Sequence, residues 1–381
     1  MKKILILILI VALLAVGFAG CNKAPAEEPM EPETEAEEQK TESEPSEDGY
    51  EIAMITDKGD ITDVGFNQYT FAAVKEYAEA NGISYKYYKP LDANDAEYLA
   101  SIELAIKGGA KIIVVPGFLW GSAIYQAQDM YPETSFILLD TTPYAADFSD
   151  FTVGDNVYSV IWAEEQVGFF AGYAAVKDGY TKLAYFGGQA VPAVIKYGYG
   201  FIAGADYAAK EMGIDDVEVK FHYTGDFIPT PKNQTTCATM YADGTEVIFA
   251  AGGGITFSTI AAAEAVDGKI IGVDVDQSAL SETIITSAMK FLGLAVKTGL
   301  ESYYAGDFLG GVDDFYHIGN AGLGMEMENA KFNVFTTADY DAVVALLKDA
   351  DNGVAAGIPT NDTHKAPTDI ETEVVKVIVV E

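Results

Sequence analysis

The chain has 381 residues, and its 23 Lys plus Arg stand against 58 Asp plus Glu, which leaves a formal net charge of -35. This charge excludes nucleic acid as a partner, because a polyanion would release no counterions here and would be repelled. A hydrophobic fraction of 49% over this length predicts two lobes with cores of their own. Apart from Cys21 the only cysteine is Cys237, so no disulfide within the folded part is expected and Cys237 is predicted to be buried.

The first residues predict export. Lys2 and Lys3 precede an apolar stretch from Ile4 to Phe18, which is shorter than the roughly 20 residues of a membrane span. Ala19-Gly20-Cys21 follows, as in a lipoprotein signal. We therefore expect residues 1–20 to be a signal peptide and Cys21 to be lipidated, on the extracytoplasmic face of the cell membrane. A plain signal peptide with an incidental cysteine is the alternative.

The segment from residue 21 to residue 49 is predicted to be a disordered acidic tether. Between residues 22 and 49, ten Glu and Asp48 stand against Lys23 and Lys40, a net charge of -9. With almost no large apolar side chain, this stretch cannot bury enough surface to offset the entropy of ordering.

From Tyr50 onward, short apolar runs alternate with stretches of helical periodicity, which predicts an α/β fold with parallel sheets covered on both faces. The expected strands are Glu51 to Thr56, Ser84 to Tyr88, Lys111 to Pro116, Ser135 to Asp140, Lys182 to Gly187, Val217 to His222, Glu246 to Ala251, Lys269 to Asp274, Lys331 to Phe335 and Val374 to Val380. The expected helices are Asn67 to Ala80, Tyr98 to Lys107, Gln166 to Lys177, Gly200 to Met212, Thr256 to Val266 and Ser287 to Ala305.

These elements form two series, which predict two doubly wound lobes. The first lobe is expected to hold residues 50–156 plus about 286–320, and the second to hold 157–285 plus about 321–381. Because ligands of open parallel sheets bind beyond the carboxyl ends of the strands, the site is expected in a cleft between the lobes.

Motifs for catalysis, metals and cofactors are missing from the sequence. The three histidines have no zinc-ligand spacing, and no Gly-x-Ser-x-Gly elbow or GxxxxGK[ST] loop occurs. Gly198, Gly200 and Gly204 are spaced like part of a dinucleotide fingerprint, but they lie about ten residues beyond their strand, so helix entry and close packing explain them better. We expect no enzyme activity, no metal and no cofactor.

The end of the first predicted strand carries ligand-binding side chains. The loop offers the carboxylates of Asp57 and Asp63, the ring of Phe66 and the carboxamide of Asn67. A carboxylate and a carboxamide can read the polar edge of a heterocycle while an aromatic ring stacks on its face. Alternatively, Phe66 belongs to the core and Asp63 only caps the next helix.

The second lobe has its own polar strand ends. Phe227 and the glycine run that contains Gly253 follow two of its strands, and Asp274 ends a third. A carboxylate can accept two hydrogen bonds from vicinal sugar hydroxyls. Lys290 offers a cation shortly afterwards, although a solvated lysine at a helix end is the other interpretation of that residue.

As a set, these segments resemble the basic membrane lipoprotein family, the nucleoside-binding lipoproteins of ABC importers. The resemblance covers residues 51 to about 335. It rests on Asp57-Lys-Gly59, Asp63-x-x-Phe-Asn-Gln68, Glu165-Gln-Val-Gly-Phe-Phe-Ala-Gly172, Gly200-Phe-x-x-Gly204, the run from Gly252, Gly272-Val-Asp-x-Asp-Gln277 and Ser287-x-x-Lys290. One departure is Gly65, which stands where the family usually has Ser.

The resemblance implies a type I periplasmic-binding-protein fold, with two Rossmann-like lobes joined by three crossovers. It implies a nucleoside, with a purine favoured, whose base lies between Phe66 and Phe227 and meets Asp57 and Asn67. Asp274, Lys290 and the backbone of Gly253 would hold the ribose. Asp140, at the end of the fourth strand, is a further candidate. The implied partners are ABC permease subunits with a separate ATPase, and the protein is expected to be a monomer.

Three other functions stay open on the sequence. A sugar or furanose-signal receptor of the same fold would also use Asp and aromatic residues. A nucleoside hydrolase would bind calcium through clustered aspartates, but Asp57, Asp60 and Asp63 lack the Asp-x-Asp core expected of it. A surface adhesin or chemoreceptor partner is compatible with the tether but does not need the cleft motifs.

Overall fold

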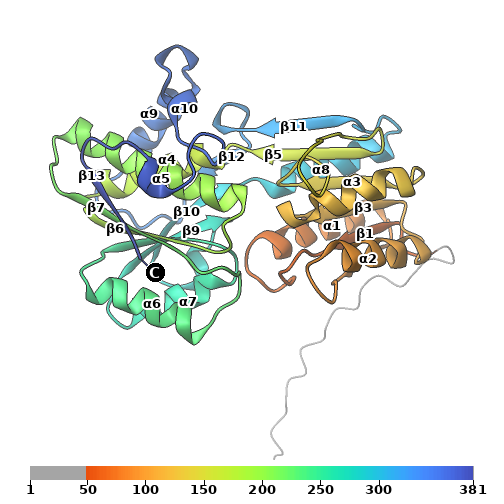
Figure 1. The fold of residues 1–381 in the computed structure, drawn as a ribbon, viewed down its shortest axis with the longest axis horizontal. Coiled ribbons are helices and arrows are strands. Elements are labelled where there is room, and N and C mark those ends of the chain that lie inside the picture. Colours follow the sequence, from red (N-terminus) through yellow and green to blue (C-terminus); the bar gives the residue numbers. More distant parts are fainter. Residues whose placement is uncertain (1–48, 381) are drawn as a thin grey trace, which may run out of the picture. The chain divides into compact units, whose positions relative to one another are not determined.

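A computed structural model describes residues 49–380, so the predicted signal peptide, Cys21 and nearly all of the tether lie outside the described residues. The described chain forms two sheets, which Figure 1 shows with their helices. The six-stranded sheet has the order β11-β5-β4-β3-β1-β2, and the seven-stranded sheet has the order β12-β10-β9-β8-β6-β7-β13. All pairings are parallel except that of β10 with β12.

The strands of the first sheet are β1 (Ile52–Ile55), β2 (Tyr85–Tyr88), β3 (Ile112–Pro116), β4 (Ser135–Leu139), β5 (Val157–Trp162) and β11 (Val312–Tyr316). Those of the second are β6 (Lys182–Gly187), β7 (Val217–Tyr223), β8 (Val247–Ala251), β9 (Lys269–Asp274), β10 (Ile284–Lys290), β12 (Leu323–Met325) and β13 (Val375–Val379). The central strands are buried on both faces, which explains why they are continuous apolar runs.

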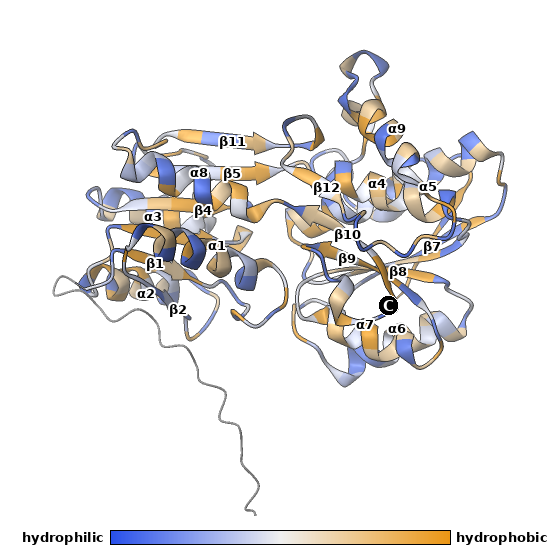
Figure 2. Ribbon diagram, turned by 180° about the vertical axis from the view of Figure 1, so that it is seen from behind, coloured by the Kyte–Doolittle hydropathy of each residue, from blue (hydrophilic) through white to orange (hydrophobic). Residues whose placement is uncertain are grey.

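Helices cover both faces of each sheet. The first lobe has α1 (Phe66–Asn81) and α8 (Leu292–Tyr304) on one face, and α2 (Asp95–Lys107) and α3 (Gly121–Met130) on the other. The second has α4 (Glu164–Lys177) and α5 (Pro192–Met212) on one face, and α6 (Pro231–Ala242) and α7 (Ile255–Glu264) on the other, with α9 (Thr337–Lys348) and α10 (Val354–Gly357) in the C-terminal segment. Figure 2 shows apolar strands beneath helices whose outer sides are polar. Cys237 is buried, as predicted.

Two predicted lobe boundaries move by a few residues. β5 pairs with β4 and β11, so the first lobe runs through Trp162 rather than ending at residue 156. β10 pairs with β9, so the second lobe runs through Lys290 rather than ending at residue 285. The chain therefore crosses between the sheets after Trp162, after Lys290 and after Tyr316, which matches the expected three crossovers.

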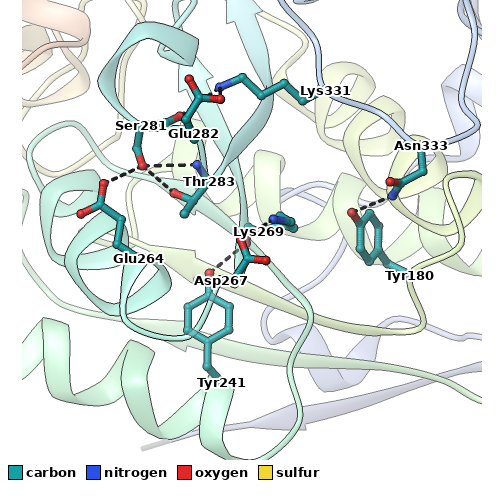
Figure 3. A network of polar contacts seen from close by, with 10 residues as sticks. All are labelled: Tyr180, Tyr241, Glu264, Asp267, Lys269, Ser281, Glu282, Thr283, Lys331 and Asn333. Atoms are coloured by element: carbon teal, nitrogen blue, oxygen red, sulfur yellow. Dashed lines mark hydrogen bonds and ion pairs between the residues drawn. The ribbon is translucent and has the colours of Figure 1, made fainter.

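Two predicted elements were wrong. The expected helix from Ser287 to Ala305 begins as β10, and α8 starts only at Leu292. The expected strand from Lys331 to Phe335 is irregular. The Lys331 N–H donates to the Ile285 oxygen of β10, but most of the other polar groups pair with side chains instead of a neighbouring strand. Lys331 Nζ lies 3.3 Å from a carboxylate oxygen of Glu282, and Asn333 Nδ2 donates to Tyr180 Oη at 3.0 Å (Figure 3).

The buried carboxylate of Asp178 completes this attachment. It accepts hydrogen bonds from the backbone N–H groups of Asn333, Val334 and Phe335 and from the side chain of Asn333. One carboxylate thus satisfies three successive backbone donors that a sheet would otherwise have paired.

Glycines explain the close crossing of α4 and α5. Added Cβ atoms at Gly168 and Gly172 would collide with the backbone of α5, and Cβ atoms at Gly200 and Gly204 would collide with the backbone of α4. The predicted packing role of these α5 glycines is therefore confirmed, but their expected role at the helix entry is wrong, because α5 begins at Pro192 rather than at Gly200. No helix among residues 49–380 combines the length and apolar character needed to span a membrane.

Candidate functional site

The eight predicted binding residues of the cleft line a single cavity. About 690 Å³ of atom-free space, including open solvent at its mouth, lies within it, and its walls are strand ends and helix starts of both lobes. The eight residues are Asp57, Phe66, Asn67, Asp140, Phe227, Gly253, Asp274 and Lys290. Residues up to 233 positions apart in the sequence are thus brought together, from Asp57 to Lys290, at the place where the carboxyl ends of both sheets meet.

A closed set of hydrogen bonds shapes the loop between β1 and α1. Asn67 Nδ2 donates to Asp57 Oδ1 and to Asp63 Oδ2, both at 2.9 Å, while Asn67 Oδ1 accepts from the backbone N–H of Asp57 at 3.2 Å. Both N–H donors of the carboxamide are therefore used within the loop. Asn67 holds Asp57 in place. Of the carboxamide atoms of Asn67, only Oδ1 can still form a further hydrogen bond, as an acceptor for a ligand.

Asp63 does cap the start of α1, as the alternative interpretation held. Its Oδ1 accepts from the backbone N–H groups of Gly65 and Gln68 at 3.0 Å each, and its Oδ2 accepts from that of Asn67 at 3.0 Å. These bonds satisfy donors that every helix leaves unpaired in its first turn. Phe66, the first residue of α1, is half-buried: it packs against the core and also lines the cavity.

Asp57 is one of the acidic groups of the first lobe that line the cavity. Burial raises its pKa to about 6, although hydrogen bonds from the Gly59 N–H and the Asn67 side chain act in the opposite direction. Both of those bonds end on Oδ1. Among the described residues no hydrogen-bond donor is assigned to Oδ2, so this oxygen is available to a donor on a ligand.

On the second lobe, Phe227 and the glycine run after β8 form the opposite wall. Phe227 packs over Gly188, and a Cβ on Gly252 would come within 2.9 Å of the Gly188 backbone. Gly253 has a φ of +54°, in the left-handed region that favours glycine. The absence of side chains here brings backbone N–H and C=O groups to the surface of the cavity.

Asp274 ends β9 and is buried. Its Oδ1 accepts from Tyr197 Oη at 3.0 Å, and its φ of +65° is unusual for a residue with a side chain. Burial raises its pKa, while the charge of Lys290 and the Tyr197 hydroxyl act to lower it. Tyr197 therefore gains a place in the site. Tyr197 and Tyr199 make this stretch of the sequence rich in tyrosine, which by itself indicates no role.

Lys290 is not a solvated helix-end lysine. It is the last residue of β10, it is 3% exposed, and its Nζ lies 2.6 Å from Asp140 Oδ1 and 2.9 Å from Glu164 Oε1. Burial acts to lower the pKa of Lys290, but Asp140 and Glu164 outweigh it and raise the pKa above its ordinary value. The ammonium group therefore stays charged inside the protein.

Sequence reasoning missed Glu164 and Lys196 next to the site. Glu164 Oε2 lies 3.3 Å from Lys196 Nζ, so this carboxylate stands between two lysines. Burial acts to raise the pKa of Glu164, but Lys290 and Lys196 bring it below the ordinary value. A Glu two residues after the strand end at Trp162 was the available signal, but it was missed because β5 itself was not predicted.

Metal-binding clusters are not found in the described part of the chain. No group of three or more His, Cys, Asp or Glu side chains within residues 49–380 is arranged to hold an ion. Asp60 instead forms an ion pair with Lys89, and the carboxylate oxygens of Asp63 accept hydrogen bonds from N–H groups at the start of α1. The aspartates of this loop are thus engaged in structural contacts.

A family model described as ABC transporter substrate-binding protein, PnrA-like, matches residues 50–352. Among curated proteins, the "ABC transporter nucleoside-binding protein BmpA" of Lactococcus lactis is 26% identical over 326 residues, covering 79% of this chain and 87% of the relative. "Basic membrane protein D" of Borreliella burgdorferi is 28% identical over 288 residues, covering 74% and 80% respectively.

Solved structures share the fold. A solute-binding protein of an ABC transporter system from Aeropyrum pernix superimposes with a TM-score of 0.66 at 23% identity, covering 84% of this chain and 90% of that one. Its counterpart from Conexibacter woesei gives a TM-score of 0.63 at 23% identity, with 80% and 97% covered. At this identity the likeness concerns the fold: two doubly wound lobes of the type I periplasmic-binding-protein class, as predicted.

Proposed function

Because the chain belongs to the family of PnrA-like ABC transporter substrate-binding proteins, we propose that its cavity binds a nucleoside, with a purine favoured, for delivery to an ABC importer. The observation that carries the proposal is the convergence of all eight predicted residues on one cavity. A curated relative is named a nucleoside-binding protein, which agrees with this ligand class. The protein would act by binding and release, without catalysis.

The base would lie between Phe66 and Phe227. These rings come from opposite lobes and line the same cavity, so a flat heterocycle between them would bury both of its faces. Asp57 would receive N–H donors of the base on Oδ2, with Asn67 holding Asp57 in position through the contact at Oδ1. Such charge-assisted hydrogen bonds are about twice as strong as neutral ones.

The ribose would lie toward Asp274 and Lys290. Asp274 has one oxygen committed to Tyr197 and can accept hydroxyl hydrogens, while the backbone at Gly253 offers polar groups at close range. A free base would leave the remaining hydrogen-bonding capacity of these buried groups unfilled, and this penalty favours the complete nucleoside.

Export and anchoring complete the proposal. A lipidated Cys21 followed by the acidic tether would hold the binding protein at the extracytoplasmic face of the membrane, close to the permease subunits that a separate ATPase drives. Among curated relatives, one from Pyrococcus furiosus is named a lipoprotein and others are named basic membrane proteins. We propose that the binding protein itself acts as a monomer.

Isothermal titration calorimetry tests the ligand class. Inosine, guanosine, adenosine, cytidine, ribose and galactose are titrated separately into ligand-depleted protein. Saturable heat with one or more nucleosides is the expected result. Heat with ribose or galactose and none with any nucleoside would favour the sugar receptor and reject the nucleoside proposal. Release of free base during incubation with a nucleoside would instead revive the hydrolase alternative.

A further inference from the structure

A second pocket, called the side pocket below, opens beside the cavity where the chain first crosses between the sheets. About 860 Å³ of atom-free space, including open solvent at its mouth, lies within it. The first lobe contributes the loop after β4 and the end of β5, and the second lobe contributes the starts of α4 and α5 together with Asn361 and Asp362. Phe118, Asp140 and Ala193 line both the side pocket and the cavity, so the two spaces share a wall.

Two phenylalanine rings of the side pocket are exposed to solvent. Phe148 is 54% exposed and Phe151 is 58% exposed, and their ring centroids lie 6.4 Å apart. The ring of Tyr144 stacks between those of Phe148 and Phe118, with centroid distances of 4.7 Å and 5.2 Å. A series of ring contacts therefore runs from solvent to Phe118, which lines the cavity.

The loop that carries the exposed rings has a defined and strained backbone. Phe148 has a φ of +58°, which a bulky residue rarely adopts. Its N–H donates to the Ala145 oxygen at 2.7 Å, and the Ala145 N–H donates to the Asp150 oxygen at 2.8 Å. Tyr144 and Phe151 form an antiparallel β-bridge across the loop. Backbone strain of this kind persists only where surrounding contacts impose it, and it is common at ligand-binding sites.

The charged groups of the side pocket disfavour an anionic ligand. Asp140, Glu164 and Asp362 line it together with one cation, Lys196. Lys196 Nζ already donates to the Trp162 oxygen at 3.1 Å and lies 3.3 Å from Glu164 Oε2. A phosphate group would therefore meet an excess of negative charge, whereas a neutral planar heterocycle could stack on the exposed rings.

We propose that the side pocket is a capture site, where the flat base of an incoming nucleoside stacks on Phe148 and Phe151 before it enters the cavity. This assignment rests on the proposed nucleoside function. Because Phe118 lines both spaces, the base can pass into the cavity while it keeps contact with an aromatic ring. Contacts kept along this path lower the free-energy barrier for entry and for exit alike. They therefore change both rate constants and leave the equilibrium affinity unchanged.

Stopped-flow kinetics test the capture site. Tryptophan fluorescence follows the reaction, because Trp162 lines the side pocket. The double variant Phe148→Leu/Phe151→Leu keeps two apolar side chains but removes both flat rings. With the nucleoside that binds wild type most tightly, we expect the association and dissociation rate constants to fall together, by about fivefold, while the calorimetric Kd stays within about twofold. Unchanged rate constants, or a Kd that weakens beyond that range, would overturn the proposal.

A matched control is Phe257→Leu. Phe257 is 41% exposed on α7 and is not among the described residues that line the cavity or the side pocket. This variant should keep both rate constants within about twofold of wild type. If it slowed entry as much as the double variant does, the effect would belong to surface rings in general and the capture site would be rejected.

Phe151→Leu alone keeps the proposal testable if the double variant does not fold. Its ring is the more exposed of the two, and we expect it to slow entry and exit equally and by more than Phe257→Leu does. Equal rate constants for Phe151→Leu and Phe257→Leu would count against capture. If wild type itself binds no nucleoside, the proposed function fails. If wild type binds and the loss of the rings leaves its rate constants unchanged, only the capture site fails.

Discussion

The two aromatic walls and the Asp274 carboxylate are the single residues on which proposed affinity depends most. Phe227→Ala should weaken nucleoside binding by about 1 to 3 kcal/mol through lost stacking and burial, and Asp274→Ala by a similar amount through lost hydrogen bonds. Calorimetry on variants with native circular dichroism measures this. A folded Asp274→Ala protein with unchanged affinity would count strongly against the ribose assignment.

Asp57 should make both binding and stability depend on pH. Its folded pKa of about 6 lies above the ordinary value of 3.8, so the folded state binds the proton more tightly and this group stabilises it at low pH. That contribution is lost as pH rises through about 6. Wild type should therefore gain about 1 kcal/mol of unfolding free energy between pH 7.5 and pH 5 relative to Asp57→Asn.

Protonation of Asp57 should also weaken the binding of the nucleoside. If Oδ2 accepts N–H donors of the base, the carboxylate form is required, and affinity should fall as pH drops below about 6. Asp140 and Glu165, whose pKa values burial raises to about 7, also titrate nearby, so the comparison is made between wild type and Asp57→Asn. Identical affinity profiles for the two proteins from pH 5 to pH 8 would argue against Asp57 as the acceptor.

Several residues of the candidate site could be predicted from their chemistry and their place in the sequence. Asp57, Phe66 and Asp274 stood out because polar and aromatic side chains at the ends of buried strands have few structural reasons to be there. Glu164, Lys196 and Tyr197 did not, because their importance comes from partners more than 25 residues away, as with the 77 residues between Tyr197 and Asp274. A local sequence pattern does not predict a contact between such distant residues.

Among the elements, the crossing of α4 and α5 depends on glycine. A Cβ at Gly204 would meet the backbone oxygen of Phe169, which cannot rotate away as a side chain could. Gly204→Val should therefore cost about 3 kcal/mol or more of unfolding free energy, measured by urea denaturation. Gly357→Ala, whose added Cβ meets nothing within 4 Å, is the control and should stay within about 0.5 kcal/mol.

Helices and strands were predicted well where the pattern of apolar residues was unambiguous. The central strands, such as Ile112–Pro116 and Lys182–Gly187, were found because burial on both faces makes them uninterrupted apolar runs. The expected helix from Ser287 was wrong at its start, since Ile284–Lys290 gains its strand form only from pairing with β9 and β12. The expected strand at residues 331–335 failed for the opposite reason, because side chains took its hydrogen bonds.

At the scale of the whole molecule, the lobes touch through the loops that border the cavity. Gln277 Nε2, from the second lobe, donates to the backbone oxygen of Val64 in the first lobe at 3.0 Å. Gly65 and Gly253 also approach each other, because a Cβ on Gly65 would lie 3.5 Å from the Gly253 Cα. These contacts join the two lobes beside the cavity.

Gln277 should therefore affect how long the ligand stays. Gln277→Ala removes a contact between the lobes, so the closed state should lose about 1 kcal/mol and nucleoside dissociation should speed up by about fivefold. Stopped-flow fluorescence measures the dissociation rate, and small-angle scattering measures the compaction on binding. An unchanged dissociation rate would mean that this contact does not stabilise closure.

The sequence by itself determined the α/β class, the two lobes, the family resemblance and eight of the residues that line the cavity, because burial patterns and polar strand ends are local features of the sequence. Only the tertiary structure decided where the chain crosses between sheets and that Lys290 is buried against Asp140 and Glu164. The physical reason is that strand pairing and the pairing of buried charges are contacts between distant residues, whose free energy exists only once both lobes are assembled.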